Sequence, residues 1–197
     1  MSNFTEIKQE ALNNNIPSMQ IEGRLFCMDY IKSNRILSIL EIGTAVGIWS
    51  IEMVLSNPSI HITTLEKSQN RYKQALSNIS DLQLSSRIDC ILVDGCLYEP
   101  NQHFDLIFID GPKSQNKILL QKYLAYLNPK GSIIIDNLDF HELTNPKIDL
   151  QGRRNLKQMV TKINTFKEWV TSQSSLNVLE MSIGDGIIIV SPKYDEL

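Results

Sequence analysis

Residues 36–47 read ILSILEIGTAVG, and this stretch decides the fold. Its first part, Ile36–Ile42, is a short apolar run of the kind that forms a strand buried on both faces of a sheet. The loop that follows contains Gly43 and Gly47, and glycines allow a tight turn and a close approach of the backbone to a ligand. The stretch therefore predicts a strand, a ligand-binding loop and then a helix.

The same alternation continues along the chain. Further strands are predicted over 60–65, 88–93, 104–109 and 132–135, the last after a turn at 128–131, and helices over 48–56, 68–80 and 114–127. A polar segment over 139–152 predicts a loop, and the chain closes with a helix over 153–170 and strands over 176–182 and 187–191, joined through Gly184-Asp185-Gly186. We predict an α/β, Rossmann-like fold whose seven-stranded sheet is mostly parallel and ends in an antiparallel β-hairpin.

The composition is that of one globular domain. The chain has 197 residues, of which 42% are hydrophobic and 21% charged, and its formal net charge is −3. This balance argues against a general nucleic-acid binder, which carries a strong basic excess, and leaves a local basic patch open. The three cysteines do not have the spacing of a disulfide framework, which predicts reduced thiols. No segment resembles a signal peptide or a membrane span, so we expect a cytoplasmic protein with no membrane partner.

Each of the first five predicted strands has an acidic residue at or next to its end. These residues are Glu41, Glu66, Asp94, Asp110 and Asp136. A single acid at a strand end is commonly the cap of the next helix. Five acids at one edge of a parallel sheet indicate more, because ligands of such sheets bind beyond the carboxyl ends of the strands.

The acids around the first loop favour S-adenosylmethionine as the ligand. The loop lacks the G-x-G-x-x-G pattern of dinucleotide sites, which argues against an NAD-dependent reductase. Glu41 would repel a pyrophosphate and suits a ligand with positive charge, and S-adenosylmethionine carries an ammonium and a sulfonium. Glu66 ends the second strand, where an acid accepts ribose hydroxyls, and Asp94-Gly95 ends the third.

A second group of residues offers only oxygen ligands. Asp110 ends the fourth predicted strand, and Asp136 and Asn137 end the fifth. Consecutive strands of this kind often neighbour each other, so we expect the side chains to share one crevice. Two carboxylates and an amide oxygen suit Mg²⁺ or Mn²⁺. The alternative is a helix cap at Asp110 and a turn at Asp136-Asn137.

The motifs as a set resemble one enzyme family. They are LEIGTAVG (40–47), TLEKS (64–68), VDG (93–95), FDLIFIDGPK (104–113) and IIIDN (133–137). In this order they resemble the metal-dependent class I O-methyltransferases related to catechol and caffeoyl-CoA O-methyltransferases, from about Pro17 to Lys193. The tail, 153–170 followed by SIGDGIIIVSPK, resembles the bacterial tRNA 5-hydroxyuridine methyltransferases most.

The resemblance implies roles for the matching residues. Cofactor contacts fall at Met19, Glu41, Gly43, Thr44, Gly47, Glu66, Asp94, Gly95 and Asp110; the metal ligands at Asp110, Asp136 and Asn137; and the catalytic residues at Lys113, as general base, and Asp110. Residues 1–35 would form a helical segment that covers the site, and 36–197 the methyltransferase domain. The family's Gly-Tyr-Ser is Gly47-Ile48-Trp49 here, with Ser50 one place late, which puts that serine's contact with the cofactor in question.

The expected substrate is 5-hydroxyuridine at the wobble position of tRNA, which methylation would convert to 5-methoxyuridine. Arg153, Arg154 and Lys157 form a basic cluster at the start of a helix that could contact phosphates. The alternative substrate is a small catechol or another vicinal hydroxy-aromatic. A non-catalytic adenosyl-binding subunit is a third interpretation, but such a subunit needs neither the metal residues nor Lys113. By analogy with the family we also expect a homodimer.

Overall fold

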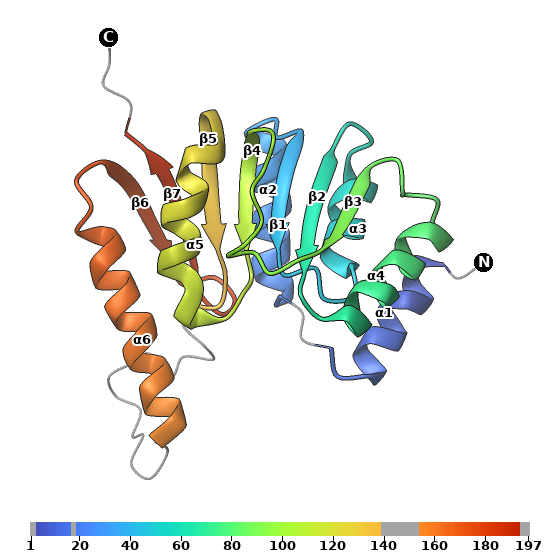
Figure 1. The fold of residues 1–197 in the computed structure, drawn as a ribbon, viewed down its shortest axis with the longest axis horizontal. Helices are drawn as coiled ribbons and strands as arrows, with labels where there is room; N and C mark the ends of the chain where they lie inside the picture. The colour runs from blue at the N-terminus through green and yellow to red at the C-terminus, as the bar shows by residue number, and fades with distance from the viewer. Residues whose placement is uncertain (1–2, 17–18, 139–153, 194–197) are drawn as a thin grey trace.

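A seven-stranded sheet forms the centre of the molecule (Figure 1). The computed structural model describes residues 3–16, 19–138 and 154–193. The strands are β1 (Ser38–Ile42), β2 (His61–Glu66), β3 (Ile88–Leu92), β4 (Phe104–Ile109), β5 (Leu127–Ile135), β6 (Leu176–Met181) and β7 (Ile187–Pro192). They lie in the order β3-β2-β1-β4-β5-β7-β6. The first five are parallel and β7 is antiparallel to both of its neighbours, so the predicted fold is confirmed.

Helices cover both faces of the sheet. They are α1 (Phe4–Asn13), α2 (Ile21–Ser33), α3 (Ile48–Ser56), α4 (Gln69–Asp81), α5 (Asn116–Tyr123) and α6 (Arg154–Thr171). In Figure 1, α5 and α6 lie in front of the sheet and α2 and α3 behind it. Each face has its own apolar core, because α5 and α6 contribute to one buried cluster and α2, α3 and α4 to the other.

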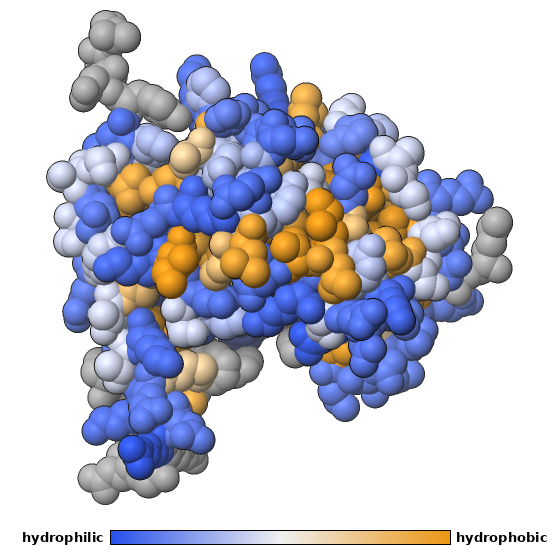
Figure 2. Space-filling view, in the orientation of Figure 1, coloured by the Kyte–Doolittle hydropathy of each residue, from blue (hydrophilic) through white to orange (hydrophobic). Residues whose placement is uncertain are grey.

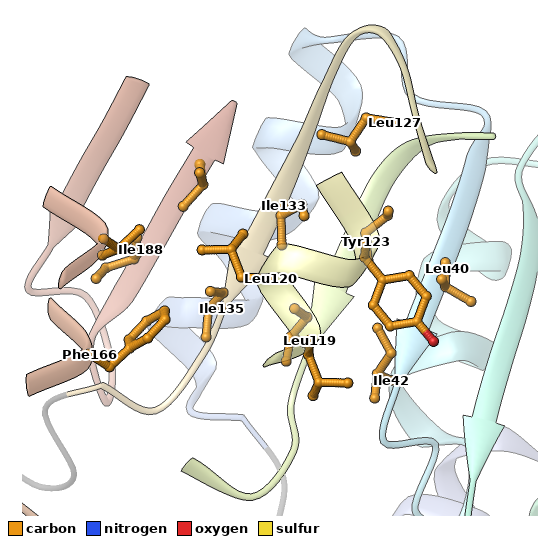
Figure 3. Packing of buried hydrophobic residues seen from close by; sticks show 14 of the residues in the cluster. Leu40, Ile42, Leu119, Leu120, Tyr123, Leu127, Ile133, Ile135, Phe166 and Ile188 are labelled. Carbon is orange, nitrogen blue, oxygen red and sulfur yellow. The ribbon is translucent and has the colours of Figure 1, made fainter. Parts of the chain in front are cut away.

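The strand sequences supply both cores at once. In β4, Ile107 and Ile109 belong to the cluster under α5, whereas Leu106 and Phe108 belong to the opposite one. Side chains alternate across a strand, so a continuous apolar run buries residues on both faces. Figure 3 shows the front cluster, where Tyr123 of α5 packs among strand residues.

The predicted helix over 114–127 is too long. The structure has a short 3-10 turn, η1 (Lys113–Gln115), then α5, then a second 3-10 turn, and β5 begins at Leu127. Leu127 pairs with Phe104 and is buried, so tertiary pairing outweighs helix propensity there. The turn expected over 128–131 lies inside β5, where it interrupts the regular strand. Lys130 has φ +68°, and the pairing of β5 with β4 shifts in register.

Two helices precede the first strand. Lys8 of α1 and Arg24 of α2 both pair with Glu52 of α3, each at 3.1 Å, and so anchor the N-terminal helices to the sheet. The division into a cover over 1–35 and a domain over 36–197 stays a prediction. The loop expected over 139–152 lies outside the described residues. Among the residues that the structure describes, no helix is long and apolar enough to span a membrane.

Candidate active site

The glycine loop after β1 packs tightly against the end of β4. The backbone N–H groups of Gly43 and Thr44 both donate to the carbonyl oxygen of Leu65, at 2.9 and 3.1 Å. Gly43 has φ +111°, and a Cβ there would lie 2.2 Å from the backbone oxygen of Asp110. Gly47, at φ +86°, caps the start of α3. The loop therefore needs glycine at 43 for both its conformation and its contact.

Glu41 lies beneath this loop. Its carboxylate is buried and accepts hydrogen bonds from the hydroxyls of Ser50 and Thr64. Burial raises the pKa of Glu41 to about 7; the two hydroxyls act against that rise, and Asp110 adds to it. Ser50 is fully buried and bound to Glu41, so its hydroxyl is occupied within the protein.

Glu66 and Asp94 are held by backbone N–H groups at the ends of β2 and β3. The two carboxylate oxygens of Glu66 accept from the N–H groups of Ala45, at 2.9 Å, and Ser68, at 2.8 Å. Asp94 accepts from the N–H of Cys96 at 2.9 Å. A carboxylate oxygen has more than one acceptor position, so both groups can still receive hydrogen bonds from ligand hydroxyls or amines.

Two cavities flank the glycine loop and share Gly43 and Asp110. One, of about 260 Å³, is also lined by Glu66, Asp94 and Gly95. The other, of about 110 Å³, is lined on its other sides by Met19, Glu41, Thr44, Trp49 and residues of α1. An elongated ligand can thus pass over Gly43 from one cavity into the other. The cofactor residues predicted from the sequence line these cavities, except Gly47, which starts α3 beside them.

The predicted metal residues come together at the ends of β4 and β5. The side-chain nitrogen of Asn137 lies 3.2 Å from Asp110 Oδ1 and 3.1 Å from Asp136 Oδ2. Burial, together with the neighbouring charge of Asp110, raises the pKa of Asp136 to about 7, and burial also raises the pKa of Asp110. A buried carboxylate at Asp136 and a half-buried one at Asp110, both facing one amide, would suit a divalent cation, which would neutralise them and to which the amide could turn its oxygen. Within the described residues, no group of three His, Cys, Asp or Glu side chains is placed to hold a metal ion.

Lys113 lies beside these carboxylates at the start of η1. Its ammonium donates to the backbone oxygen of Asp136 at 3.0 Å. Burial lowers the pKa of Lys113, while the negative charges of Asp110, Asp136 and Asp185 act against that change. A lysine whose ammonium is destabilised by burial can serve as a proton acceptor.

The basic residues expected on α6 lie further out. Arg154 and Lys157 are exposed, and Arg153 lies outside the described residues. A groove of about 260 Å³ between η1, α5 and α6 is lined by Lys113, Ser114, Lys117, Thr161, Lys162, Thr165, Phe166 and Trp169. Thr161, Thr165 and Trp169 line this groove and are spaced four residues apart on α6. Lys157 lies four residues before Thr161, so it lies on the helix face toward the groove.

Three further side chains lie around the site, and the sequence pointed to only one of them, Trp49. Asp185, in the turn before β7, accepts from the amide of Gln20 at 2.6 Å and raises the pKa of Asp136. Arg24 and Trp49 line the smaller cavity. Trp49 stands at the family's serine position beside the glycine loop, whereas Asp185 and Arg24 reach the site only through tertiary packing.

Comparison with known proteins identifies the family. A parallel sheet with a terminal antiparallel hairpin, and carboxylates beyond its strand ends, defines a class I methyltransferase. The sequence matches the O-methyltransferase family over residues 2–193, and the chain belongs to that family. It is therefore an S-adenosylmethionine-dependent O-methyltransferase, as predicted.

Individual relatives agree with this assignment. The chain is 26% identical to a putative caffeoyl-CoA O-methyltransferase from Staphylococcus aureus, whose crystal structure superposes with a TM-score of 0.89 over 98% of this chain and 93% of that one. A caffeoyl-CoA O-methyltransferase from Populus kitakamiensis is 25% identical over 176 residues, 85% of this chain and 74% of its own. An O-methyltransferase from Bacillus cereus, solved with S-adenosylhomocysteine, shares the fold at 23% identity and a TM-score of 0.76, over 96% and 90% of the two chains.

Proposed function

We propose that this enzyme uses Mg²⁺ or Mn²⁺ to methylate 5-hydroxyuridine at the tRNA wobble position, giving 5-methoxyuridine. The observation that supports a metal ion is the pair of carboxylates, Asp110 and Asp136, which both accept a hydrogen bond from the side-chain amide of Asn137. Asp110 also lines both cavities beside the glycine loop. Asp110 and Asp136 would hold the metal, and Asp110 would place it beside the cofactor cavities.

The cofactor would lie across both cavities. Glu66 would accept the ribose hydroxyls, and Asp94 and Gly95 would flank the adenine in the larger cavity. The methionyl part would pass over Gly43 into the smaller cavity, where Glu41 attracts its ammonium and Met19 covers it. This orientation places the amino-acid end of the ligand, which carries both charges, in the cavity that is lined by both acidic and basic side chains.

The reaction is an in-line transfer. When bound, the metal lowers the pKa of the substrate hydroxyl and holds its oxygen. Lys113, held at Asp136 by its 3.0 Å hydrogen bond, accepts the hydroxyl proton and passes it to solvent. The oxygen forms a bond to the methyl carbon while the bond from that carbon to sulfur breaks, and the electron pair stays on sulfur. S-adenosylhomocysteine and the methyl ether are the products.

The groove beside Lys113 favours a polyanionic substrate. Lys113, Lys117 and Lys162 surround it, and Arg154 and Lys157 extend the same positive surface along α6. Hydroxyl and aromatic side chains line it between the lysines. Phosphates of an anticodon stem could bind there while a loop base, which needs no melting of a duplex, enters the site.

An assay with two substrates tests this proposal. Purified enzyme is incubated with S-adenosylmethionine and Mg²⁺, and either tRNA carrying 5-hydroxyuridine or a catechol. Both substrates present vicinal oxygens to the metal, so the catalytic residues alone do not distinguish them. We expect methylation of the tRNA; efficient turnover of the catechol with none of the tRNA would replace the proposed substrate by a small hydroxy-aromatic. Turnover of neither substrate by folded enzyme that binds the cofactor would favour an adenosyl-binding subunit.

We also propose a homodimer. Figure 2 shows apolar side chains gathered across the middle of the viewed face. Leu97, after β3, and Ile118, on α5, are 75% and 57% exposed. Light scattering should give twice the chain mass, and Leu97→Asp should shift it toward the monomer; a monomeric wild type would contradict the proposal.

A further inference from the structure

Two buried nitrogen donors in the smaller cavity lack an acceptor. They are Nε of Arg24 and Nε1 of Trp49, and neither has a hydrogen-bond partner in the described part of the chain. Both side chains line the same cavity of about 110 Å³. Leaving a buried donor unsatisfied costs about 1–3 kcal/mol, and native proteins rarely tolerate two at one place. A ligand that brings an acceptor into this cavity would satisfy both donors.

Packing holds both donors in position. Nη1 of Arg24 donates to Oε2 of Glu52 at 3.1 Å, and the same carboxylate pairs with Lys8. The Trp49 ring packs against Phe108, with ring centroids 6.0 Å apart. Both N–H groups thus belong to side chains that other contacts hold in place, which lowers the entropic cost of binding an acceptor.

Charges of opposite sign line this cavity. Glu41 and Asp110 contribute carboxylates, whereas Arg24 and Lys8 contribute positive charge. A ligand group with an ammonium near the acids and an acceptor near Arg24 and Trp49 matches that arrangement. An α-amino acid has both charges on one carbon, and the methionyl end of S-adenosylmethionine is such a group.

We propose that Arg24 and Trp49 bind the methionyl carboxylate of S-adenosylmethionine, each through one N–H. The hydroxyl of Ser50, the residue after Trp49, is engaged by Glu41 and does not compete for this role. The proposal concerns the cofactor alone. It holds or fails independently of the metal and of the tRNA substrate proposed above.

Calorimetric titration with two ligands tests the proposal without measuring catalysis. S-adenosylmethionine is compared with decarboxylated S-adenosylmethionine, which keeps the ammonium and the sulfonium and lacks the carboxylate. We expect Trp49→Phe, which removes the N–H and retains an aromatic ring, to weaken S-adenosylmethionine about tenfold, since hydrogen bonds to charged groups are the stronger ones. The affinity for the decarboxylated ligand should change less than about twofold. Equal losses for both ligands, or no loss for either, would overturn the proposal.

Controls separate binding from structure. Arg24→Met should reproduce the selective loss of affinity for S-adenosylmethionine. Glu52→Gln leaves both N–H donors in place and should lose less of this affinity. Tyr126→Phe removes a hydrogen bond to Glu99 outside this cavity and should alter neither affinity. Thermal unfolding shows which variants fold. The wild type supplies a test that needs no variant, because equal affinity for the two ligands would contradict a carboxylate site.

Discussion

The ammonium of Lys113 donates a hydrogen bond to the backbone oxygen of Asp136 at 3.0 Å. This contact joins η1, which follows β4, to the end of β5 and holds the lysine beside the carboxylates of both strands. A proton acceptor and two oxygen ligands are thereby fixed at one edge of the sheet, next to the glycine loop.

Divalent metal should stabilise the protein through Asp136. Mg²⁺ or Mn²⁺ should raise the melting temperature of the wild type, because a ligand that binds only the folded state shifts unfolding by mass action. Differential scanning fluorimetry of Asp136→Asn should show little or no rise. EDTA should abolish methyl transfer and Mg²⁺ should restore it, while S-adenosylhomocysteine still binds Asp136→Ala. Full activity in EDTA would mean that Asp110, Asp136 and Asn137 are structural.

Glu41 should make the stability of the ligand-free protein depend on pH. Its pKa is raised from 4.5 to about 7 in the folded state, mainly by burial. The folded state therefore holds this proton more tightly than the unfolded state does. The resulting contribution to the stability of the fold is complete below the unfolded pKa and is lost as the pH rises through 7. Between about pH 5 and pH 8, the free energy of unfolding of the wild type should fall by up to roughly 3 kcal/mol more than that of Glu41→Gln. Urea titrations at both pH values measure this, and parallel losses would contradict it.

Glu66 should carry much of the cofactor affinity. Its oxygens are already aligned by the N–H groups of Ala45 and Ser68, so little ordering is needed when ribose hydroxyls bind. Glu66→Gln should weaken S-adenosylhomocysteine about tenfold or more, because an ionised acceptor forms the stronger hydrogen bond. Calorimetry with NAD should give no signal. Tight NAD binding without an S-adenosylhomocysteine signal would refute the assigned cofactor site.

Two glycines at this edge should respond differently to substitution. Gly43 has φ +111°, and a Cβ would meet the Asp110 backbone oxygen at 2.2 Å, whereas at Gly111 the nearest atom would be Leu119 Cδ1 at 3.7 Å. We expect Gly43→Ala to destabilise the fold by at least about 2 kcal/mol and Gly111→Ala by much less. Chemical denaturation of the matched pair provides the comparison. Equal stability of the two variants would show that the loop relaxes freely.

The basic surface of α6 should contribute to the methylation of tRNA and not to that of small substrates. Replacing Arg153, Arg154 and Lys157 by alanine should weaken tRNA methylation, and Lys162→Ala should add to the loss. Wild-type activity on tRNA should fall steeply with salt, because phosphate contacts release counterions. Lys32→Ala, on α2, provides a control. Equal effects of salt on tRNA and catechol turnover would contradict a phosphate-binding role.

The strand ends were predictable from sequence because two local patterns coincide there. Apolar runs identify β1 and β4, and an acid lies at or next to the end of each run. These ends form the edge at which a parallel sheet binds its ligands. The end of the helix before β5 was not predictable, since Leu127 joins the sheet only through its pairing with Phe104. The approach of Arg24 to the smaller cavity depends on how the N-terminal helices dock, which no local pattern encodes.

The most direct test of the proposed function is mass spectrometry of tRNA nucleosides from cells that lack this protein. The account predicts loss of 5-methoxyuridine and accumulation of 5-hydroxyuridine, reversed by the wild-type chain and not by Asp136→Ala. Unchanged 5-methoxyuridine in those cells would contradict it.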